Sequence, residues 1–298
     1  MPRISICIPA YNAEKYLAET LESVRSQTFK DWELIVTEDG SKDGVEAMVR
    51  AFAQSVTQPV RYRRHEVNQG LPATRNTGIA ASHGDWIALL DSDDCWLPEH
   101  LETAVAVQSK TGADIVHAGS ILFDSDTGKE LGVRAPDAEV IGRFPLSMFV
   151  GDYLVQPSSV LLSKSLWERV GGFDPTFRYV EDAEMWLRCA RNGARFVYTG
   201  KNTCRYRKHG EALSTHSAEM SVACARLFEK HLDWEVLPED LRRRSASDAW
   251  TSAARILQRS EPRRAAEYLI RAWHAGASGP GVLVRAWVLR LYALLTRR

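Results

Sequence analysis

Residues 85–95 read DWIALLDSDDC, and this short stretch decides how the rest of the sequence is interpreted. The apolar run at residues 86–90 has the composition of a buried β-strand, and Asp91, Asp93 and Asp94 follow it within four positions. Three carboxylates at this spacing repel one another, so a positive group is expected beside them. The candidates are a basic side chain, a helix N-terminus and a metal ion.

The residues around this stretch alternate between β-branched runs and helical patterns. We expect strands at residues 4–9, 33–40, 60–65 and 86–90, and helices at residues 13–27 (capped by Asn12), 43–54 and 71–82. This alternation predicts an α/β fold with a parallel sheet covered by helices, in which ligands bind beyond the carboxyl ends of the strands. Pro9, Asp39 and Asp91 fall at such ends and are expected at one edge of the sheet.

The composition excludes several classes of protein. Lys plus Arg and Asp plus Glu both total 38 in 298 residues, so no overall charge favours a nucleic acid partner. The five cysteines are dispersed and form no Cys-x-x-Cys pair, which argues against disulfides and a zinc site. The N-terminus lacks the pattern of a signal peptide, and no apolar run reaches the roughly 20 residues that span a bilayer. A cytoplasmic protein is expected.

The acidic stretch itself favours a metal ion. Side chains alternate along an extended segment, so Asp91 and Asp93 can point the same way with Ser92 turned aside. Two such carboxylates are hard oxygen ligands for Mg²⁺ or Mn²⁺, which usually take their remaining ligands from substrate phosphates. A diphosphate is therefore the expected ligand. The alternative is that the four residues form a turn and cap the following helix.

Three spaced motifs carry a family resemblance. They are PAYNAEKYLAETLESVRSQTFKDWELIVTEDGSKDG at 9–44, NQGLPATRNTGIAASHGDWIALLDSDD at 68–94 and GGFDPTFRYVEDAEMWLR at 171–188. Together, in this order, they resemble the inverting family 2 glycosyltransferases of the GT-A fold, of the bacterial cell-surface polysaccharide type. The resemblance covers roughly residues 3–215 and implies a nucleotide-binding, parallel-core sheet flanked by helices. We expect a catalytic domain at 1–215 and a C-terminal helical region at 216–298.

The resemblance assigns residues of the first motif to the nucleotide pocket. It implies that Pro9 shapes the turn after the first strand and that Tyr11 lies against the base, where an aromatic ring offers a stacking surface. A half-buried packing tyrosine is the alternative. Asp39 matches an acid that hydrogen-bonds the base, since a carboxylate accepts from a ring N–H. Glu38 stands where the family more often has aspartate, which leaves its role open.

The second motif supplies the diphosphate and metal residues. Arg75 matches an arginine that approaches the diphosphate, to which a planar guanidinium is suited; an exposed arginine on a solvated helix face is the alternative. Asp91, with Ser92 beside it, matches the residue near the ribose and the metal. Asp93 matches the residue that binds the metal, expected to be Mn²⁺ or Mg²⁺, most directly. Asp94 is expected to cap or orient the site.

The third motif supplies a general base. Glu181 and Asp182 precede a helical pattern, and capping of that helix could explain both acids. The resemblance instead implies that Asp182 takes the proton from the acceptor hydroxyl as the hydroxyl oxygen attacks the anomeric carbon. Glu181 is expected to support Asp182 or to contact the acceptor.

Two further segments resemble parts of the same pocket. Residues 151–175 resemble the acceptor side, where Gln156, Ser158 and Ser159 could touch sugar hydroxyls. The stretch CRYRKHGEALS at 204–214 resembles a segment that folds back toward the donor, where Arg207 and His209 could hold phosphate. A surface position or an internal hydrogen bond is the alternative for His209.

The last eighty or so residues lie beyond the resemblance, and residues 238–298 read as helices. In the last helix, apolar residues share one side, with Arg285 and Arg290 flanking it: Leu283, Val284, Trp287, Val288, Leu291, Leu294 and Leu295. This pattern is typical of a helix in a membrane interface, so peripheral contact with the inner face of the cell membrane is one interpretation. Packing onto the catalytic domain or a dimer partner is the other, because Leu289 lies on the opposite side.

The expected function is transfer of a sugar from a nucleotide-diphosphate donor, a UDP-sugar as first choice, to a hydroxyl of a glycan or lipid-linked saccharide. Two alternatives remain open: a nucleotidyltransferase acting on sugar phosphates, and a non-catalytic module that binds sugar nucleotides or glycans. Intact Asp91, Asp93 and Asp182 favour catalysis. A homo-oligomer is compatible with the sequence.

Overall fold

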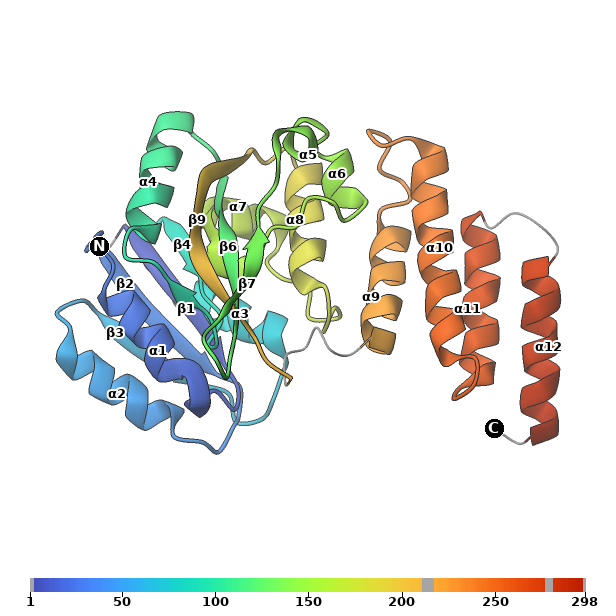
Figure 1. Cartoon of the computed structure of the whole chain (residues 1–298), viewed down its shortest axis with the longest axis horizontal. Coiled ribbons are helices and arrows are strands. Elements are labelled where there is room, and N and C mark those ends of the chain that lie inside the picture. Colours follow the sequence, from blue (N-terminus) through green and yellow to red (C-terminus); the bar gives the residue numbers. More distant parts are fainter. Residues whose placement is uncertain (1–2, 211–216, 277–280, 297–298) are drawn as a thin grey trace. The chain divides into compact units, whose positions relative to one another are not determined.

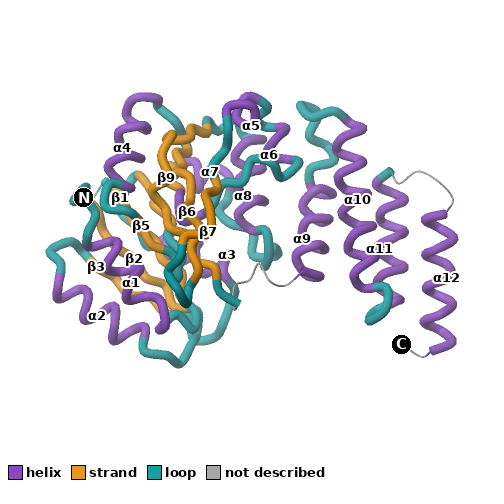
Figure 2. Tube along the Cα trace, in the orientation of Figure 1, coloured by secondary structure: helices purple, strands orange, loops and turns teal. Residues whose placement is uncertain are grey.

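The computed structural model describes residues 3–210, 217–276 and 281–296. The chain divides into two compact units, Met1–Gly210 and Glu211–Arg298 (Figure 1). The first is a mixed α/β unit, and the described part of the second is helical (Figure 2).

The first half of the α/β unit has the predicted alternation of strands and helices. Its strands are β1 (Ile4–Ala10), β2 (Trp32–Glu38), β3 (Val60–Arg64) and β4 (Trp86–Leu89), and its helices are α1 (Glu14–Arg25), α2 (Val45–Ser55) and α3 (Leu71–Ala80). The strands are parallel in the order β3-β2-β1-β4. The prediction of a parallel sheet is confirmed for this half.

Side-chain alternation places helices on both faces of these strands. In β1, Ile4, Ile6 and Ile8 join the core cluster that also contains residues of α1 and α2. Cys7 points to the opposite face, where it lies beside Gly78 of α3. Strands buried on both faces read as continuous apolar runs, which is why β1 and β2 were recognisable in the sequence.

Two local predictions in this half are wrong. Asn12 does not cap α1: it has φ of 50°, and the helix follows Ala13 without a side-chain cap. Pro9 does not shape the turn either, because it lies inside β1, paired with Thr37 of β2. Proline has no backbone N–H to donate to a neighbouring strand. It is tolerated at position 9 because the pairing of β1 with β4 ends at Cys7 and Leu89, so β4 offers no acceptor that this N–H would have to meet.

The second half of the sheet was not predicted. It continues from β4 in the order β8-β6-β9-β5, with β7 paired to β6. The bounds are β5 Cys95–Trp96, β6 Ile115–Asp124, β7 Glu130–Arg134, β8 Val160–Ser163 and β9 Phe196–Lys208. Strand β8 is antiparallel to both neighbours, whereas β6 and β9 are parallel. The intervening helices are α4 His100–Thr111, α5 Ala138–Gly142, α6 Leu146–Phe149, η1 Pro157–Ser159, α7 Lys164–Val170 and α8 Glu181–Arg191.

One pairing in this half matters for the acidic stretch. The short strand β5 follows directly after Asp94 and pairs antiparallel with β9, with Cys95 opposite Arg205. This pairing brings the end of β9 back beside the aspartates, although more than 100 residues separate the two segments in sequence.

The described part of the second unit is a series of helices, α9 Ser217–Lys230, α10 Glu239–Leu257, α11 Pro262–Ala275 and α12 Gly281–Thr296. Trp250 of α10 is buried in a cluster with Ala225 of α9 and Ala272 of α11. Figure 1 shows α10, α11 and α12 following one another side by side within this unit. None of the helices in the described ranges is both long enough and apolar enough to cross a membrane.

Candidate active site

The predicted nucleotide residues follow strands β1 and β2. Tyr11 comes directly after β1 and is about half exposed, which leaves its ring open to a stacking partner. Asp39 comes directly after β2, and its backbone N–H donates to the carbonyl of Ala10 at 2.8 Å. The ends of the two strands therefore hold Tyr11 and Asp39 at the same edge of the sheet.

The Asp39 carboxylate is bound by the segment that leads into α3. It accepts hydrogen bonds from the backbone N–H groups of Gln69 and Gly70, both at 2.8 Å, and contacts Nδ1 of His65 at 2.7 Å. Burial opposes ionisation of Asp39, but these hydrogen bonds lower its pKa below the ordinary value. His65 was not singled out in the sequence, because only the β2–β3 pairing brings it to Asp39.

Glu38, whose role the sequence left open, is buried and structural. Its carboxylate accepts hydrogen bonds from the hydroxyls of Tyr62 and Ser41. Burial raises the pKa of Tyr62, and the Glu38 carboxylate raises it further. The contact with Ser41 holds the loop after β2.

Each of the three clustered aspartates has its own hydrogen-bond donor or basic partner. Asp91 Oδ1 accepts from Nη2 of Arg75 at 2.7 Å. Asp93 Oδ2 lies 2.9 Å from Nε2 of His209. Asp94 Oδ1 accepts from the backbone N–H of Arg207 at 2.9 Å. The sequence predicted one positive group beside the aspartates, and the structure places three groups there. The Arg75 guanidinium comes from α3, the Arg207 N–H from the end of β9, and the His209 ring from the residues after β9.

Arg207 holds the backbone of the acidic loop rather than facing an open phosphate site. Its guanidinium Nε donates to the carbonyl of Asp93 at 2.7 Å, and Nη2 pairs with Glu19 of α1. The side chain is buried, with its guanidinium over the rings of Tyr16 and Phe123. These contacts argue against the interpretation of Arg207 as a phosphate-binding residue, because its buried guanidinium is already held by Asp93, Glu19 and two aromatic rings.

Asp94 is fully buried behind the other two acids. Burial raises its pKa well above the ordinary value, and the charges of Asp93 and Asp91 raise it further. Its contact with the Arg207 N–H joins the acidic loop to β9. The expected role of Asp94 in capping or orienting the site stays a prediction.

Arg75 connects the acidic loop to the third motif. Its Nη1 donates to Oε1 of Glu181 at 2.6 Å while Nη2 binds Asp91, so one guanidinium bridges two carboxylates. The guanidinium also lies 5.4 Å from the ring centre of Phe173. Arg75 is only 2% exposed, so the alternative of a solvated helix face is excluded. Its bridging of the two motifs was not foreseen.

Glu181 and Asp182 open helix α8, directly after Val180 with φ of 52°. Glu181 is buried; burial raises its pKa to about 7, with the Asp182 charge adding to the rise and Arg75 opposing it. Asp182 is less buried, and Oδ1 accepts from the N–H of Ala183 at 2.8 Å. Burial raises the pKa of Asp182 too, against the effect of Arg75. A carboxyl whose pKa is raised by burial is a candidate for proton transfer.

Asp91 and Asp93, the residues expected to hold a metal ion, offer two carboxylates but no complete set of protein ligands. Within the described ranges, no cluster of three or more His, Cys, Asp or Glu side chains is arranged to hold an ion. Asp91 and Asp93 keep side-chain exposures of 22% and 34%, unlike Asp94. Nδ1 of His209, opposite the nitrogen at Asp93, is buried and meets no hydrogen-bond partner in the part of the chain that the structure describes. Two accessible carboxylates suit an ion that takes its other ligands from a diphosphate.

The other polar residues predicted for the site, Ser92, Gln156, Ser158 and Ser159, mostly contact the protein itself. Ser92 is partly exposed, and its carbonyl accepts from Thr20 of α1 at 2.9 Å. Ser158 and Ser159 are fully buried, so the prediction that they touch sugar hydroxyls is wrong. Ser158 Oγ instead accepts from the backbone N–H of Asp91 at 3.0 Å, which steadies the acidic loop. Gln156 is partly exposed, and its side-chain oxygen accepts from Arg134 at 3.1 Å.

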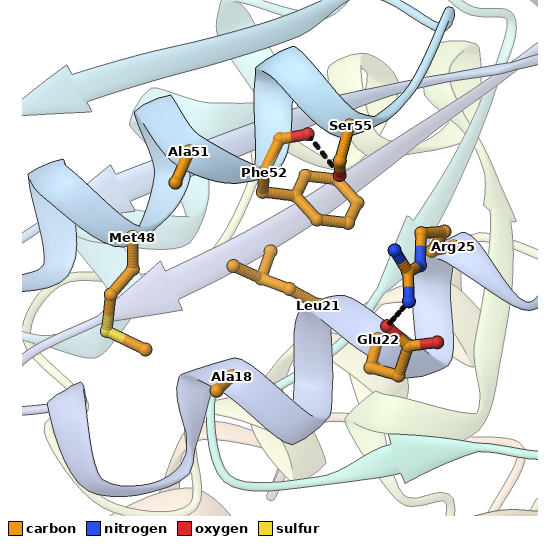
Figure 3. Close-up of a pocket in the computed structure, with 8 residues that line it drawn as sticks. All are labelled: Ala18, Leu21, Glu22, Arg25, Met48, Ala51, Phe52 and Ser55. Atoms are coloured by element: carbon orange, nitrogen blue, oxygen red, sulfur yellow. Dashed lines mark hydrogen bonds and ion pairs between the residues drawn. The ribbon is translucent and has the colours of Figure 1, made fainter.

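A surface groove of about 330 Å³ lies elsewhere, between α1 and α2 (Figure 3). Leu21 of α1 and Phe52 of α2 face one another across it, and Arg25 pairs with Glu22 at its side. No predicted site residue lines this groove. The groove is therefore separate from the acidic site.

Comparisons with known proteins agree with the motifs. Residues 5–155, half of the chain, match the family model Glycosyl transferase family 2, and residues 86–289 match Glycosyl transferase family group 2. The chain is 29% identical over 239 residues to "Putative glycosyltransferase EpsE" of Bacillus subtilis, covering 76% of this chain and 83% of that protein. It is 26% identical over 237 residues to the UDP-Glc:alpha-D-GlcNAc-diphosphoundecaprenol beta-1,3-glucosyltransferase WfgD of Escherichia coli, covering 78% and 85%. Several related Rickettsia glycosyltransferases are longer, and the chain spans 35% to 59% of their lengths.

Solved structures have the same fold. S. aureus TarS 1–349 in complex with UDP-GlcNAc superposes with a TM-score of 0.70 at 16% identity, covering 92% of this chain and 82% of that one. The mannosyltransferase PcManGT of Pyrobaculum calidifontis, in complex with GDP-Man and Mn²⁺, gives a TM-score of 0.63 at 18% identity, covering 100% and 81%. The GT-A fold expected from the three motifs is thus confirmed, and the chain belongs to glycosyltransferase family 2.

Proposed function

We propose that this glycosyltransferase moves a sugar from a UDP-sugar to a hydroxyl of a saccharide carried on a lipid diphosphate, with inversion at the anomeric carbon. The observation that carries the proposal is the Arg75 bridge, which binds Asp91 at 2.7 Å and Glu181 at 2.6 Å. One buried side chain thereby fixes the distance between the acidic loop expected to hold the donor and the helix that begins with Glu181 and Asp182.

The choice of donor and acceptor rests on relatives. WfgD is named for UDP-Glc and a diphosphoundecaprenol-linked acceptor, and the TarS structure contains UDP-GlcNAc. These names support a UDP-sugar donor and a lipid-linked acceptor here. Membership of a glycosyltransferase family also favours glycosyl transfer over nucleotidyl transfer to a sugar phosphate.

In this proposal the donor end of the site is formed by residues after β1, β2 and β4. The exposed ring of Tyr11 stacks on the base, and Asp39 braces the loop beside it through Gln69 and Gly70. Asp91 and Asp93 hold Mn²⁺ or Mg²⁺, an assignment that the Mn²⁺ complex of PcManGT supports. When bound with the donor, that ion supplies positive charge to the departing diphosphate.

The acceptor end is formed by the start of α8. The Asp182 carboxylate accepts the proton of the acceptor hydroxyl as that oxygen bonds to the anomeric carbon and the bond from this carbon to the diphosphate oxygen breaks. Glu181, held by Arg75, keeps the first turn of α8 in place while Asp182 acts. A single displacement of this kind inverts the anomeric configuration.

A donor screen tests the proposal. The unfolding temperature of the full-length protein is measured with UDP-, GDP- and dTDP-sugars, with and without Mn²⁺. A donor present at about 100 times its Kd adds about 2.7 kcal/mol to the free energy of unfolding. We expect UDP-sugars to raise the unfolding temperature, and more so with Mn²⁺. A larger shift with GDP- or dTDP-sugars would contradict the choice of donor, and equal shifts without metal would contradict the metal assignment.

The stereochemistry of the product tests the reaction. With a polyprenyl-diphosphate-linked N-acetylhexosamine as acceptor, an α-linked UDP-sugar should give a β-linked product, which NMR distinguishes by the coupling of the anomeric proton. A product that retains the α configuration would contradict the single displacement.

A further inference from the structure

Helix α12 (Gly281–Thr296) has two apolar faces, and only one of them is packed. Ala286 is buried, and with Val282 and Leu289 it contacts the core cluster of α10 and α11. Leu289 therefore does pack, but on α10 and α11 of its own unit, a partner that was not expected from the sequence. The opposite face carries large apolar side chains that remain exposed: Leu283, Val284, Trp287, Val288, Leu291 and Leu294. We call these six residues the exposed face of α12.

The exposed face is a continuous stripe. Successive residues of an α-helix are turned by about 100°, so Val284, Trp287, Leu291 and Leu294 line up along the helix. Trp287 stands near the middle of the stripe and is 65% exposed, far more than the indoles buried in the core. Single exposed apolar residues are common on protein surfaces. A continuous stripe of this length is instead typical of a surface that binds a membrane or another protein.

Two arginines border the stripe. On the same angular scale, Arg290 lies at one edge of the exposed face and Arg285 at the other, between this face and the packed face. Helix α12 contains no acidic residue. The wider region agrees with this charge, since residues 241–298 contain twelve Arg and no Lys, against three acids.

We propose that the exposed face of α12 docks the protein on an anionic lipid surface, with the helix lying in the plane of the interface. In this position Trp287 and Leu291 enter the boundary between headgroups and acyl chains, while Arg285 and Arg290 extend sideways to lipid phosphates. The 16 residues of α12 extend about 24 Å, which is shorter than the apolar core of a bilayer. The helix therefore lies along the surface rather than across it.

A second copy of the chain fits the same face less well. If two α12 helices packed through their exposed faces, each would bring Arg285 and Arg290 to the interface, and neither helix would offer an acidic partner. Like charges facing one another across an apolar contact are unfavourable, whereas anionic headgroups supply the missing negative charge. Charge complementarity thus favours lipid.

Vesicle flotation with the full-length protein tests the proposal without any transfer assay, so its failure is distinct from failure of the proposed function. We expect binding to vesicles containing phosphatidylglycerol and little binding to vesicles of phosphatidylcholine alone. The double variant Trp287→Glu and Leu291→Glu should bind at least about tenfold more weakly. Arg290→Gln should weaken binding about fivefold, by loss of one basic side chain near the surface.

Val236→Glu is the matched control, because Val236 is 72% exposed in the same unit but lies outside α12. It should bind as the wild type does, and all variants should keep the wild-type circular dichroism spectrum. Equal binding of the wild type to both kinds of vesicle would overturn the anionic assignment. Undiminished binding by the double variant would overturn the role of α12. Absence of vesicle binding, with a dimer that the double variant converts to a monomer in light scattering, would assign the face to a second copy.

Discussion

At the scale of single residues, Arg75 accounts for the arrangement of the site. It is buried, and it connects Asp91, in the loop after β4, to Glu181, at the start of α8. A buried guanidinium with two carboxylate partners costs desolvation energy, which is recovered only when both hydrogen bonds form. The position of α8 relative to the acidic loop therefore depends on both contacts.

Arg75→Lys tests this connection. Lysine keeps the charge, but its compact ammonium cannot reproduce the two divergent hydrogen bonds of the guanidinium. We expect kcat to fall about 10²-fold, since a small misplacement of catalytic groups has an effect of that size. The free energy of unfolding should fall by about 2 kcal/mol in a denaturant titration. Arg63→Lys, on the exposed side of β3, is the control; an unchanged kcat in Arg75→Lys would refute the positioning role.

The raised pKa of Asp182 predicts the pH dependence of transfer. The base must be unprotonated, so kcat rises with pH through the pKa of Asp182 in the enzyme–substrate complex. Burial raises that pKa above 3.8, and therefore moves the acid limb of the kcat profile to higher pH than an exposed aspartate gives. The measurement is kcat between about pH 4 and pH 8. A rate that stays constant down to the pKa of an ordinary aspartate would show that Asp182 is not the titrating base.

Asp93→Ala tests the metal assignment. The change relieves repulsion among the three acids, so the fold should be retained, while the Mn²⁺-dependent part of UDP binding should be lost. Calorimetric titration of UDP with and without Mn²⁺ measures this directly. Asp126→Ala, at an exposed position in the loop before β7, should leave the metal dependence unchanged. If Asp93→Ala still binds UDP more tightly with Mn²⁺, Asp93 is not the metal ligand.

Sequence and structure differ most for residues whose partners are distant in the chain. Asp91, Asp93 and Asp182 stood out because acids after a strand or before a helix are visible locally. The part played by Arg207 was not visible, because it depends on the β5–β9 pairing that brings Arg207 to Asp93 and Asp94. Ser158 was misread for the same reason, since its hydroxyl is buried against the Asp91 backbone.

At the scale of elements, the parallel half of the sheet was predictable and the other half was not. Strands β1 and β2 are apolar on both faces and are separated by amphipathic helices, which gives a clear pattern. Strand β8 has only four residues, and β9 runs for thirteen with half-buried side chains and a shifted register against β6. Short or irregular strands show only a weak alternation of apolar and polar residues. The sequence therefore does not indicate that β8 lies antiparallel between β4 and β6.

The close approach of the chain before β4 to strand β1 predicts the effect of a substitution at Gly84 on stability. A Cβ atom at Gly84, just before β4, would lie 2.8 Å from the backbone nitrogen of Ser5 and 3.0 Å from the carbonyl carbon of Ile4. Backbone atoms of a central strand cannot move aside easily, so Gly84→Ala should lower the free energy of unfolding by about 1–3 kcal/mol. Gly142→Ala, where a Cβ meets no atom within 4 Å, should change it little. Equal stability of the two variants in urea titrations would contradict this packing.

At the scale of the whole molecule, the chain combines an α/β unit with a helical unit. The sequence motifs end near residue 215, and the contacts divide the chain at Gly210, but assigning catalysis to residues 1–215 alone stays a prediction. The α12 proposal concerns the second unit and would place a lipid-linked acceptor and the enzyme on the same surface.

The central claim is that Asp182 is the base of a glycosyl transfer whose donor is held elsewhere in the site. The most direct measurement compares Asp182→Asn with the wild type and with Asp126→Asn, recording UDP-sugar affinity by calorimetry and transfer by release of UDP in the presence of acceptor. Asparagine preserves size and can still accept from the Ala183 N–H, but it cannot take the acceptor proton. We predict that donor affinity stays within about twofold while transfer falls by roughly 10²-fold or more. Transfer at the wild-type rate, or loss of donor binding together with transfer, would contradict the claim.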